Sequence, residues 1–382
     1  MTKRVLTLLL FILVLRVSVK AQSSQETDST QMAFLPALAF NTDLGFIGGG
    51  IASFYNYKDN TRPFYSYTNL SAIFSTKGLA SVDILYDKPF VFGTNMRLKT
   101  NVFVSRFFQD PYYGVANYRV IEEDPPNGMP DFYQFKSFSV GFNSTLRIPL
   151  SINEKNQQLD ALAILNLDYE TPWDSKSDQL MTREQPRGFG GGRTFMIGSG
   201  LIWEGRDNEF NPTSGAYIET TLEIGNKLWG GTFNNLVIKH EMFHYFTFYL
   251  IKDITLANRF YAEHTSGETP YWKLAYAGDD ETLRGYPSRR FLDDNVAILN
   301  NELRAWLVEF PSVDTKLGAV LFFDVGRTFS NGNTFDEITS DLKYTIGFAG
   351  TASLFTPDFI IRGDVGFSEE GTGVYITTGY MF

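Results

Sequence analysis

Sixteen segments of alternating apolar and polar residues run along this chain, and most have the length of one membrane-crossing strand. A tilted strand needs ~9 to 11 residues to cross a bilayer. After the apolar run at the amino terminus, no stretch is long and apolar enough for a spanning helix. The pattern therefore predicts an all-β, antiparallel protein. The segments are 33–41, 46–56, 65–74, 79–87, 96–107, 134–148, 157–169, 193–204, 215–224, 234–247, 252–264, 295–307, 316–325, 343–354, 358–367 and 373–382.

The connections between these segments alternate in length. The three longest connections (108–133, 170–192 and 265–294) fall on one side of the predicted sheet, and the turns on the other side are short. Outer-membrane barrels have short periplasmic turns and longer external loops. The alternation therefore predicts a 16-stranded transmembrane β-barrel with both mature termini in the periplasm. A large soluble β-sandwich is the competing interpretation of the composition alone, in which 16% of residues are aromatic.

The amino-terminal residues have the features of an export signal. Lys3 and Arg4 precede a short apolar run, and the small residues before Gln22 predict a signal-peptidase cleavage site after Ala21. We therefore expect a signal peptide at 1–21, a disordered periplasmic lead at 22–31 and the barrel at 32–382. The residue after the predicted cleavage site is Gln22 rather than cysteine, so no lipoprotein anchor is implied. The predicted barrel itself is expected to be integral to the outer membrane.

Charge and cysteine content exclude several classes of function. The formal net charge is −10, and no basic stretch is present, which argues against nucleic acid as a partner. The chain has no cysteine, so it has no disulfide, thiolate zinc site or cysteine nucleophile. We predict no metal and no cofactor, and outer-membrane lipid as the surroundings.

Side-chain alternation predicts which charges face the barrel lumen. In 295–307 the leucines share one face, and Asn300, Glu302 and Arg304 share the other. Asp324 alternates with the apolar face of 316–325, and Arg362 and Asp364 alternate with that of 358–367. Period-two geometry therefore places these charges inside the barrel.

Three motifs give a resemblance to a known family. Leu283-Arg284-Gly285-Tyr286, Asn300–Arg304 and Val320–Gly326 resemble the barrel of the BamA/TamA-like and two-partner-secretion superfamily, also known as the bacterial surface antigen family, over about residues 32–382. The resemblance implies a sixth external loop, here 265–294, inserted in the lumen, with Arg284 contacting Glu302 and Asp324. These contacts are either a lock that stabilises the barrel or a support that holds a gate in position.

The two terminal strands meet at the closure of such a barrel. Pro36 lies in the first strand and cannot donate to a ladder, so it either weakens this seam or merely starts the strand. Tyr380 and Phe382 are predicted on the last strand at the same seam. A terminal aromatic residue resembles the signal by which outer-membrane barrels are recognised for insertion.

One motif points to an enzyme instead. His240-Glu241-Met242-Phe243-His244 matches the zinc-protease pattern, with Glu263 as a possible third ligand. Its flanks are β-branched and aromatic, and residues four apart on a strand are ~13 Å apart, too far to share one zinc. We therefore predict that this protein is not an enzyme.

The resemblance implies a part in outer-membrane protein assembly or translocation. Family members that do this carry periplasmic POTRA domains, and only 22–31 precede the barrel here. We therefore expect a subunit or accessory that works with other outer-membrane or periplasmic assembly proteins. The alternative is a plugged pore or structural outer-membrane protein without translocation activity.

Overall fold

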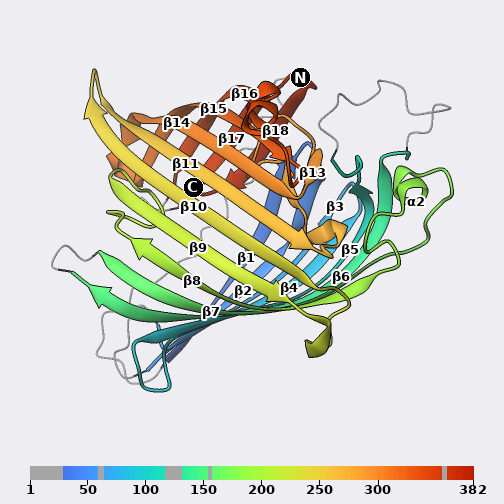
Figure 1. Ribbon diagram of the computed structural model, residues 1–382. Helices are drawn as coiled ribbons and strands as arrows, with labels where there is room; N and C mark the ends of the chain where they lie inside the picture. Colours follow the sequence, from blue (N-terminus) through green and yellow to red (C-terminus); the bar gives the residue numbers. More distant parts are fainter. Residues whose placement is uncertain (1–28, 59–63, 117–130, 154–156, 355–358) are drawn as a thin grey trace.

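The computed structural model describes residues 29–58, 64–116, 131–153, 157–354 and 359–382. Sixteen antiparallel strands close into one barrel, as predicted (Figure 1). The strands are β1 (Ser29–Asn41), β2 (Gly45–Tyr57), β3 (Ser66–Ser75), β4 (Leu79–Val91), β5 (Met96–Pro111), β6 (Gln134–Ile152), β7 (Gln158–Pro172), β8 (Gly192–Glu204), β9 (Gly215–Gly225), β10 (Asn235–Tyr249), β11 (Asp253–Gly267), β14 (Asn295–Phe310), β15 (Thr315–Phe329), β16 (Lys343–Ser353), β17 (Ile360–Phe367) and β18 (Thr372–Thr378).

The predicted alternation of faces is confirmed in the strands that carry the lumen charges. On β14, Leu299 and Leu303 are exposed on the outer wall, whereas Glu302 is buried. On β15, Leu321 is exposed and Asp324 is fully buried. Apolar side chains thus face the lipid, and charged side chains face inward.

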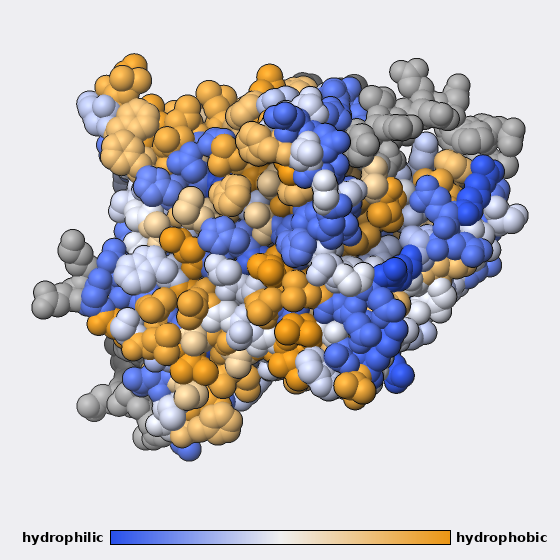
Figure 2. All heavy atoms as spheres, viewed as in Figure 1, coloured by the Kyte–Doolittle hydropathy of each residue, from blue (hydrophilic) through white to orange (hydrophobic). Residues whose placement is uncertain are grey.

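Within the described ranges, the helices are short and lie in the connections between strands. They are α2 (Leu180–Glu184), α3 (Phe335–Ser340) and the 3-10 turns η2 (Lys227–Trp229), η3 (Tyr271–Lys273) and η4 (Pro311–Val313). Among the described residues, no helix has the length and apolarity to cross a membrane. In Figure 2 hydrophilic surface gathers at the right, where α2 lies, and apolar surface lies over the strands.

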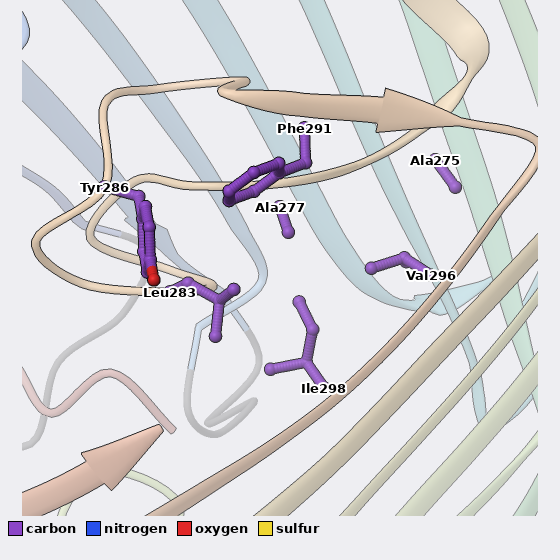
Figure 3. Close-up of a cluster of buried hydrophobic side chains, with 7 residues drawn as sticks. All are labelled: Ala275, Ala277, Leu283, Tyr286, Phe291, Val296 and Ile298. Carbon is purple, nitrogen blue, oxygen red and sulfur yellow. The ribbon is translucent and has the colours of Figure 1, made fainter. Parts of the chain in front are cut away.

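The connection between β11 and β14, residues 268–294, is called loop 6 here. It contains η3 and a small two-stranded sheet of β12 (Ala275–Ala277) and β13 (Phe291–Asp293). Its apolar side chains pack on Val296 and Ile298, which lie on the inner face of β14 (Figure 3). Loop 6 therefore lies against the inner wall of the barrel. The cluster comprises Ala275, Ala277, Leu283, Tyr286, Phe291, Val296 and Ile298.

The structure differs from the sequence prediction at both ends of the sheet. The predicted lead, 22–31, is too long, because Ser29, Thr30 and Gln31 already pair with β2. The predicted last strand, 373–382, is also too long, because β18 ends at Thr378. Gly379 has a φ of +82°, a left-handed conformation that turns the chain away from β17. The predicted signal peptide at 1–21 and residues 22–28 of the lead lie outside the described residues.

Candidate functional site

The Leu283–Tyr286 segment, here called the latch motif, holds loop 6 to the inner wall. Nε and Nη2 of Arg284 donate to the two oxygens of Asp324 at 2.8 and 2.7 Å, and Nη1 donates to Glu302 at 2.6 Å. The guanidinium also stacks on Phe322, 3.5 Å from its ring centroid. Arg284 is 1% exposed. The predicted contact of one arginine with two lumen acids is therefore present in the structure.

A third acid and two further arginines extend this contact into a network. Nη1 of Arg284 also donates to Asp364 at 3.2 Å. Arg362 donates to both Glu302 and Asp364, and Arg304 donates to Glu302 at 2.8 Å. Three buried cations thus face three buried anions, which offsets the large cost of burying isolated charges.

The sequence prediction placed Arg362 and Asp364 in the lumen but did not include them in the latch. The signal that could have found them was already available, because both alternate with the lipid face of their strand. The sequence pattern did not show which strands face one another across the lumen. That order brings the side chains of β17 to the arginine in loop 6.

The remaining latch residues fix the backbone of loop 6. The N–H of Gly285 donates to Tyr375 Oη, and its carbonyl accepts from Ser368 Oγ, both at 2.9 Å. Gly285 has a φ of +96°, and a Cβ there would lie 3.0 Å from the carbonyl oxygen of Gly366. Only glycine combines this conformation with such a close approach. Leu283 and Tyr286 are buried in the cluster of Figure 3.

Loop 6 also contacts both sides of the seam between β1 and β18. The N–H of Ser288 donates to Asp43, which follows β1, at 2.9 Å. Arg290 donates to Glu370, in the hairpin between β17 and β18, at 2.6 Å. The loop therefore ties the first and last strands together at the ends that lie beside Asp43 and Glu370.

The predicted seam residues do not lie together. Pro36 is in β1, opposite Gly50 of β2, as the prediction required. Tyr380 and Phe382 are not on the last strand, which corrects the prediction. Phe382 is 8% exposed and packs in the lumen against Tyr245 and Ala257. An aromatic side chain gains more from this apolar pocket than from a sheet edge.

The zinc-protease pattern lies on a strand, as predicted. His240 and His244 alternate with Glu241 along β10, so they point to the opposite face of the sheet from Glu241. Glu241 instead accepts from Arg259 in the lumen at 2.7 Å. The described residues contain no group of three or more His, Cys, Asp or Glu side chains that would hold a metal ion.

The loop between β5 and β6 contributes to an aromatic cluster with loop 6. Tyr112 is 2% exposed and packs with Met181 and Tyr271, which come from α2 and loop 6. Its hydroxyl donates to Glu184 at 2.8 Å. Tyr118 and the acidic run 122–124 lie outside the described residues.

A polar cavity of about 710 Å³ lies between loop 6 and the wall formed by β7 to β11. Charged side chains of both signs line it, and they include Lys239, Glu263 and Arg289. Loop 6 therefore fills only part of the lumen.

The comparisons with known proteins agree with this architecture. Residues 39–372 match the model of the Omp85 superfamily domain. The structure resembles BamA from Haemophilus ducreyi lacking POTRA domains 1–3, with a TM-score of 0.62 and 12% identity, over 94% of this chain and 71% of that chain.

It also resembles two CdiB proteins over 94% of this chain. The TM-score is 0.56 for each. CdiB from Acinetobacter baumannii is 14% identical and covered over 61% of its length, and CdiB from Escherichia coli is 12% identical and covered over 64%. The chain thus spans less than two thirds of either CdiB chain. No curated protein matches the sequence significantly.

The family match covers most of the chain, and the strand count and the order of strands agree with it. The chain belongs to the Omp85 superfamily of bacterial outer-membrane β-barrel proteins.

Proposed function

We propose that this protein takes part in inserting proteins into the outer membrane, or in moving them across it, as a subunit or accessory of a larger assembly. The observation that carries the proposal is the incomplete seam of the barrel. Every residue of β1 pairs with β2, yet only Phe40 and Asn41 have partners on β18. Residues 29–39 therefore present a strand edge with no partner on β18.

Pro36 reinforces this weakness. The N–H of Thr42 donates to Val374 on β18 at 3.0 Å. Because successive residues of a strand point their N–H groups to alternate sides, position 36 faces the same side as position 42. Proline has no N–H, so a ladder bond is missing on the side that faces the seam.

An open strand edge is a template for another strand. Its free N–H and C=O groups pair with an extended peptide, and the alternate side chains give specificity. An unfolded client segment that adds to β1 would enter the barrel wall and gain lipid contact as it leaves. Loop 6 keeps β1 and β18 together at their external ends through Asp43 and Glu370, so separation would begin at the periplasmic end.

The resemblance to solved structures supports a role within an assembly, since BamA and CdiB are among those that this barrel resembles, at 12–14% identity. Under this proposal, periplasmic partner proteins deliver the client. Both mature termini are placed in the periplasm under this proposal.

The first test is depletion followed by quantitative proteomics of the outer membrane. The proposal expects a broad loss of barrel proteins or of secreted clients. An unchanged outer-membrane proteome would count against it. Affinity purification from membranes should recover stable partner proteins with the barrel.

The second test closes the seam chemically. The chain has no cysteine, so Phe40→Cys with Ile376→Cys gives one disulfide between paired residues. Directly opposite residues of antiparallel strands have a Cα separation of about 4.5 to 5.5 Å, which a disulfide accepts. Complementation should fail under oxidising conditions and return with reductant, whereas each single-cysteine variant should complement in both. Full complementation by the oxidised double variant would exclude client entry that requires Phe40 to separate from Ile376, and would confine opening to residues 29–39, which have no partner on β18.

The cavity beside loop 6 favours a second candidate function, a plugged pore. A pore without translocation activity would conduct ions when the purified protein is placed in a planar bilayer. It would also leave the proteome unchanged after depletion. The two readouts together separate the candidates.

A further inference from the structure

A row of three polar side chains crosses the outer wall of the barrel. His244 on β10 lies opposite Asn258 on β11, and Asn258 lies opposite Asn301 on β14. Each of the three directly precedes a buried, inward-facing residue, so its own side chain points outward to the lipid. These inward residues are Tyr245, Arg259 and Glu302. The set of His244, Asn258 and Asn301 is called the outer polar row here.

The outer polar row lies at the depth of the lipid tails. Each of its residues is within two positions of the midpoint of its strand. The outward residues Leu256 and Phe260 flank Asn258 along β11, and leucines flank Asn301 along β14. In Figure 1 β10, β11 and β14 lie side by side on the near wall, and Figure 2 shows hydrophilic surface among the apolar surface over them. The row therefore interrupts an otherwise apolar, membrane-facing wall.

The hydrogen-bonding groups of this row are largely unused. Within the described residues, its one side-chain hydrogen bond runs from Nδ2 of Asn301 to the carbonyl oxygen of Phe323 at 3.4 Å. The neighbouring outward residue His240, by contrast, is bonded to Thr220 Oγ1 at 2.9 Å. Lipid tails offer neither donors nor acceptors, so an amide without a partner at this depth costs free energy. A membrane-embedded surface with hydrogen-bonding groups would remove that cost.

The chemistry of the row favours a second copy of this chain as that surface. The row is bounded by Ala216 on β9 and Phe323 on β15, so its polar groups are confined to three strands. An asparagine amide both donates and accepts, so two identical amides form two hydrogen bonds across a two-fold axis. Asn258 is the middle member of the row, where such an axis would pass. Neither asparagine carries a charge, so facing copies of the row meet no like-charge repulsion there.

We propose that β10, β11 and β14 form the interface of a homodimer whose two-fold axis runs along the membrane normal beside Asn258. Asn258 then pairs with Asn258 of the second copy. His244 and Asn301 lie on either side of this amide pair, each facing the other type across the axis. Because strands of such barrels tilt by about 35–45°, these flanking groups differ in depth by about 6 Å, which their side chains and a bridging water span.

This dimer goes beyond the proposed function and does not rest on it. β14, β11 and β10 are the fifth, sixth and seventh strands from β1 in the order of the barrel. The interface is therefore separate from the seam between β1 and β18, which stays in contact with lipid in each copy.

Replacing the central amide distinguishes an interface from a structural role. Asn258→Leu removes two hydrogen bonds and should raise the dissociation constant of the dimer by about tenfold or more, measured by sedimentation equilibrium in a density-matched detergent. Asn258→Gln keeps an amide and should still dimerise. Leucine suits a lipid-facing position, so the monomeric barrel should resist urea as well as before. An unchanged dissociation constant, or a less stable monomer, would overturn the interface.

Cross-linking in native membranes tests where the axis lies. The chain has no cysteine, so Asn258→Cys supplies one thiol at the proposed axis, and oxidation should give a linked species of twice the monomer mass. The matched control is Val104→Cys, at an outward residue of β5 that is 41% exposed. It should cross-link at least about tenfold less, because a held pair has a far higher effective concentration than a colliding one. Equal cross-linking of the two variants would indicate random collision and overturn the interface.

A photo-reactive p-benzoylphenylalanine at position 258 identifies the occupant of this wall in cells. An adduct between two copies of this chain supports the proposal. An adduct with another protein would overturn the homodimer and assign the outer polar row to that protein, and the absence of any adduct would also overturn it. These outcomes do not depend on the outer-membrane proteome after depletion, so the dimer and the assembly function are tested separately.

Discussion

Replacing Arg284 with methionine should destabilise the barrel through one particular acid. Methionine keeps most of the packing on Phe322 and removes the charge. Asp324 is fully buried, and its hydrogen bonds within the described part of the chain all come from Arg284. Glu302, by contrast, keeps Arg304 and Arg362. The change therefore leaves Asp324 as the unpaired buried charge.

The expected loss of stability follows from this difference between Asp324, which loses its arginine, and Glu302, which keeps two. Removing one partner of a buried ion pair lowers the free energy of unfolding by about 3 to 5 kcal/mol. Adding Asp324→Asn removes the unpaired charge, so the double variant should recover about 2 kcal/mol of that loss. Adding Glu302→Gln instead should recover nothing, because it leaves Arg304 and Arg362 short of an acid.

Urea-induced unfolding in phosphocholine vesicles, followed by tryptophan fluorescence, gives the four free energies of each double-mutant cycle. The coupling between positions 284 and 324 should exceed the coupling between 284 and 302 by more than about 1 kcal/mol, within the range of contacting pairs. Equal recovery by the two acid substitutions would show that the network shares its charge evenly. The reasoning from Asp324 would then be wrong.

Three further predictions concern the contacts of loop 6. Gly366→Ala should detach the latch motif at a cost of about 1 to 3 kcal/mol, because the new Cβ would lie 3.0 Å from the backbone of Arg284; limited proteolysis should then cut loop 6 faster. Tyr375→Phe leaves the N–H of Gly285 without its acceptor and should cost about 1 to 3 kcal/mol in the same urea assay. Burial raises the pKa of Asp279 in loop 6 to about 7, so this acid favours the folded loop in its neutral form. That stability is present at low pH and is lost as the pH rises through about 7; hydrogen exchange of loop 6 should therefore quicken between pH 5 and 8, and Asp279→Asn should flatten the change.

The Arg284→Ala variant distinguishes a functional role of Arg284 from a purely stabilising one. An Arg284→Ala protein that still assembles as a folded barrel but no longer supports outer-membrane assembly identifies the latch as the support of a gate. If the Arg284→Ala protein instead loses barrel folding and function to the same extent, the latch motif is a structural lock.

Alternation along the chain predicted the number of strands and the faces of those that carry the lumen charges. The predicted segments 215–224 and 295–307 correspond to β9 and β14 within three residues at each end. Period-two patterning is strong here because one face meets lipid and the other meets charged lumen groups. The resemblance added the pairing of Arg284 with Glu302 and Asp324, which alternation alone does not connect.

The last strand shows where such reasoning fails. Residues 373–382 alternate like the other strands, so nothing local marks the end of β18 at Thr378. The end is set by a left-handed glycine and by a pocket on β10 and β11, more than a hundred residues earlier in the chain. Tertiary burial of Phe382 overrides the local pattern.

The latch depends on side chains from loop 6, β14, β15 and β17 meeting in the lumen. A crystal structure of the protein grown from a lipid phase tests this most directly. The account predicts the Arg284 guanidinium within hydrogen-bond distance of both Glu302 and Asp324, as in the contacts of 2.6 and 2.7 Å described above. Arg284 in open solvent, away from both acids, would contradict it.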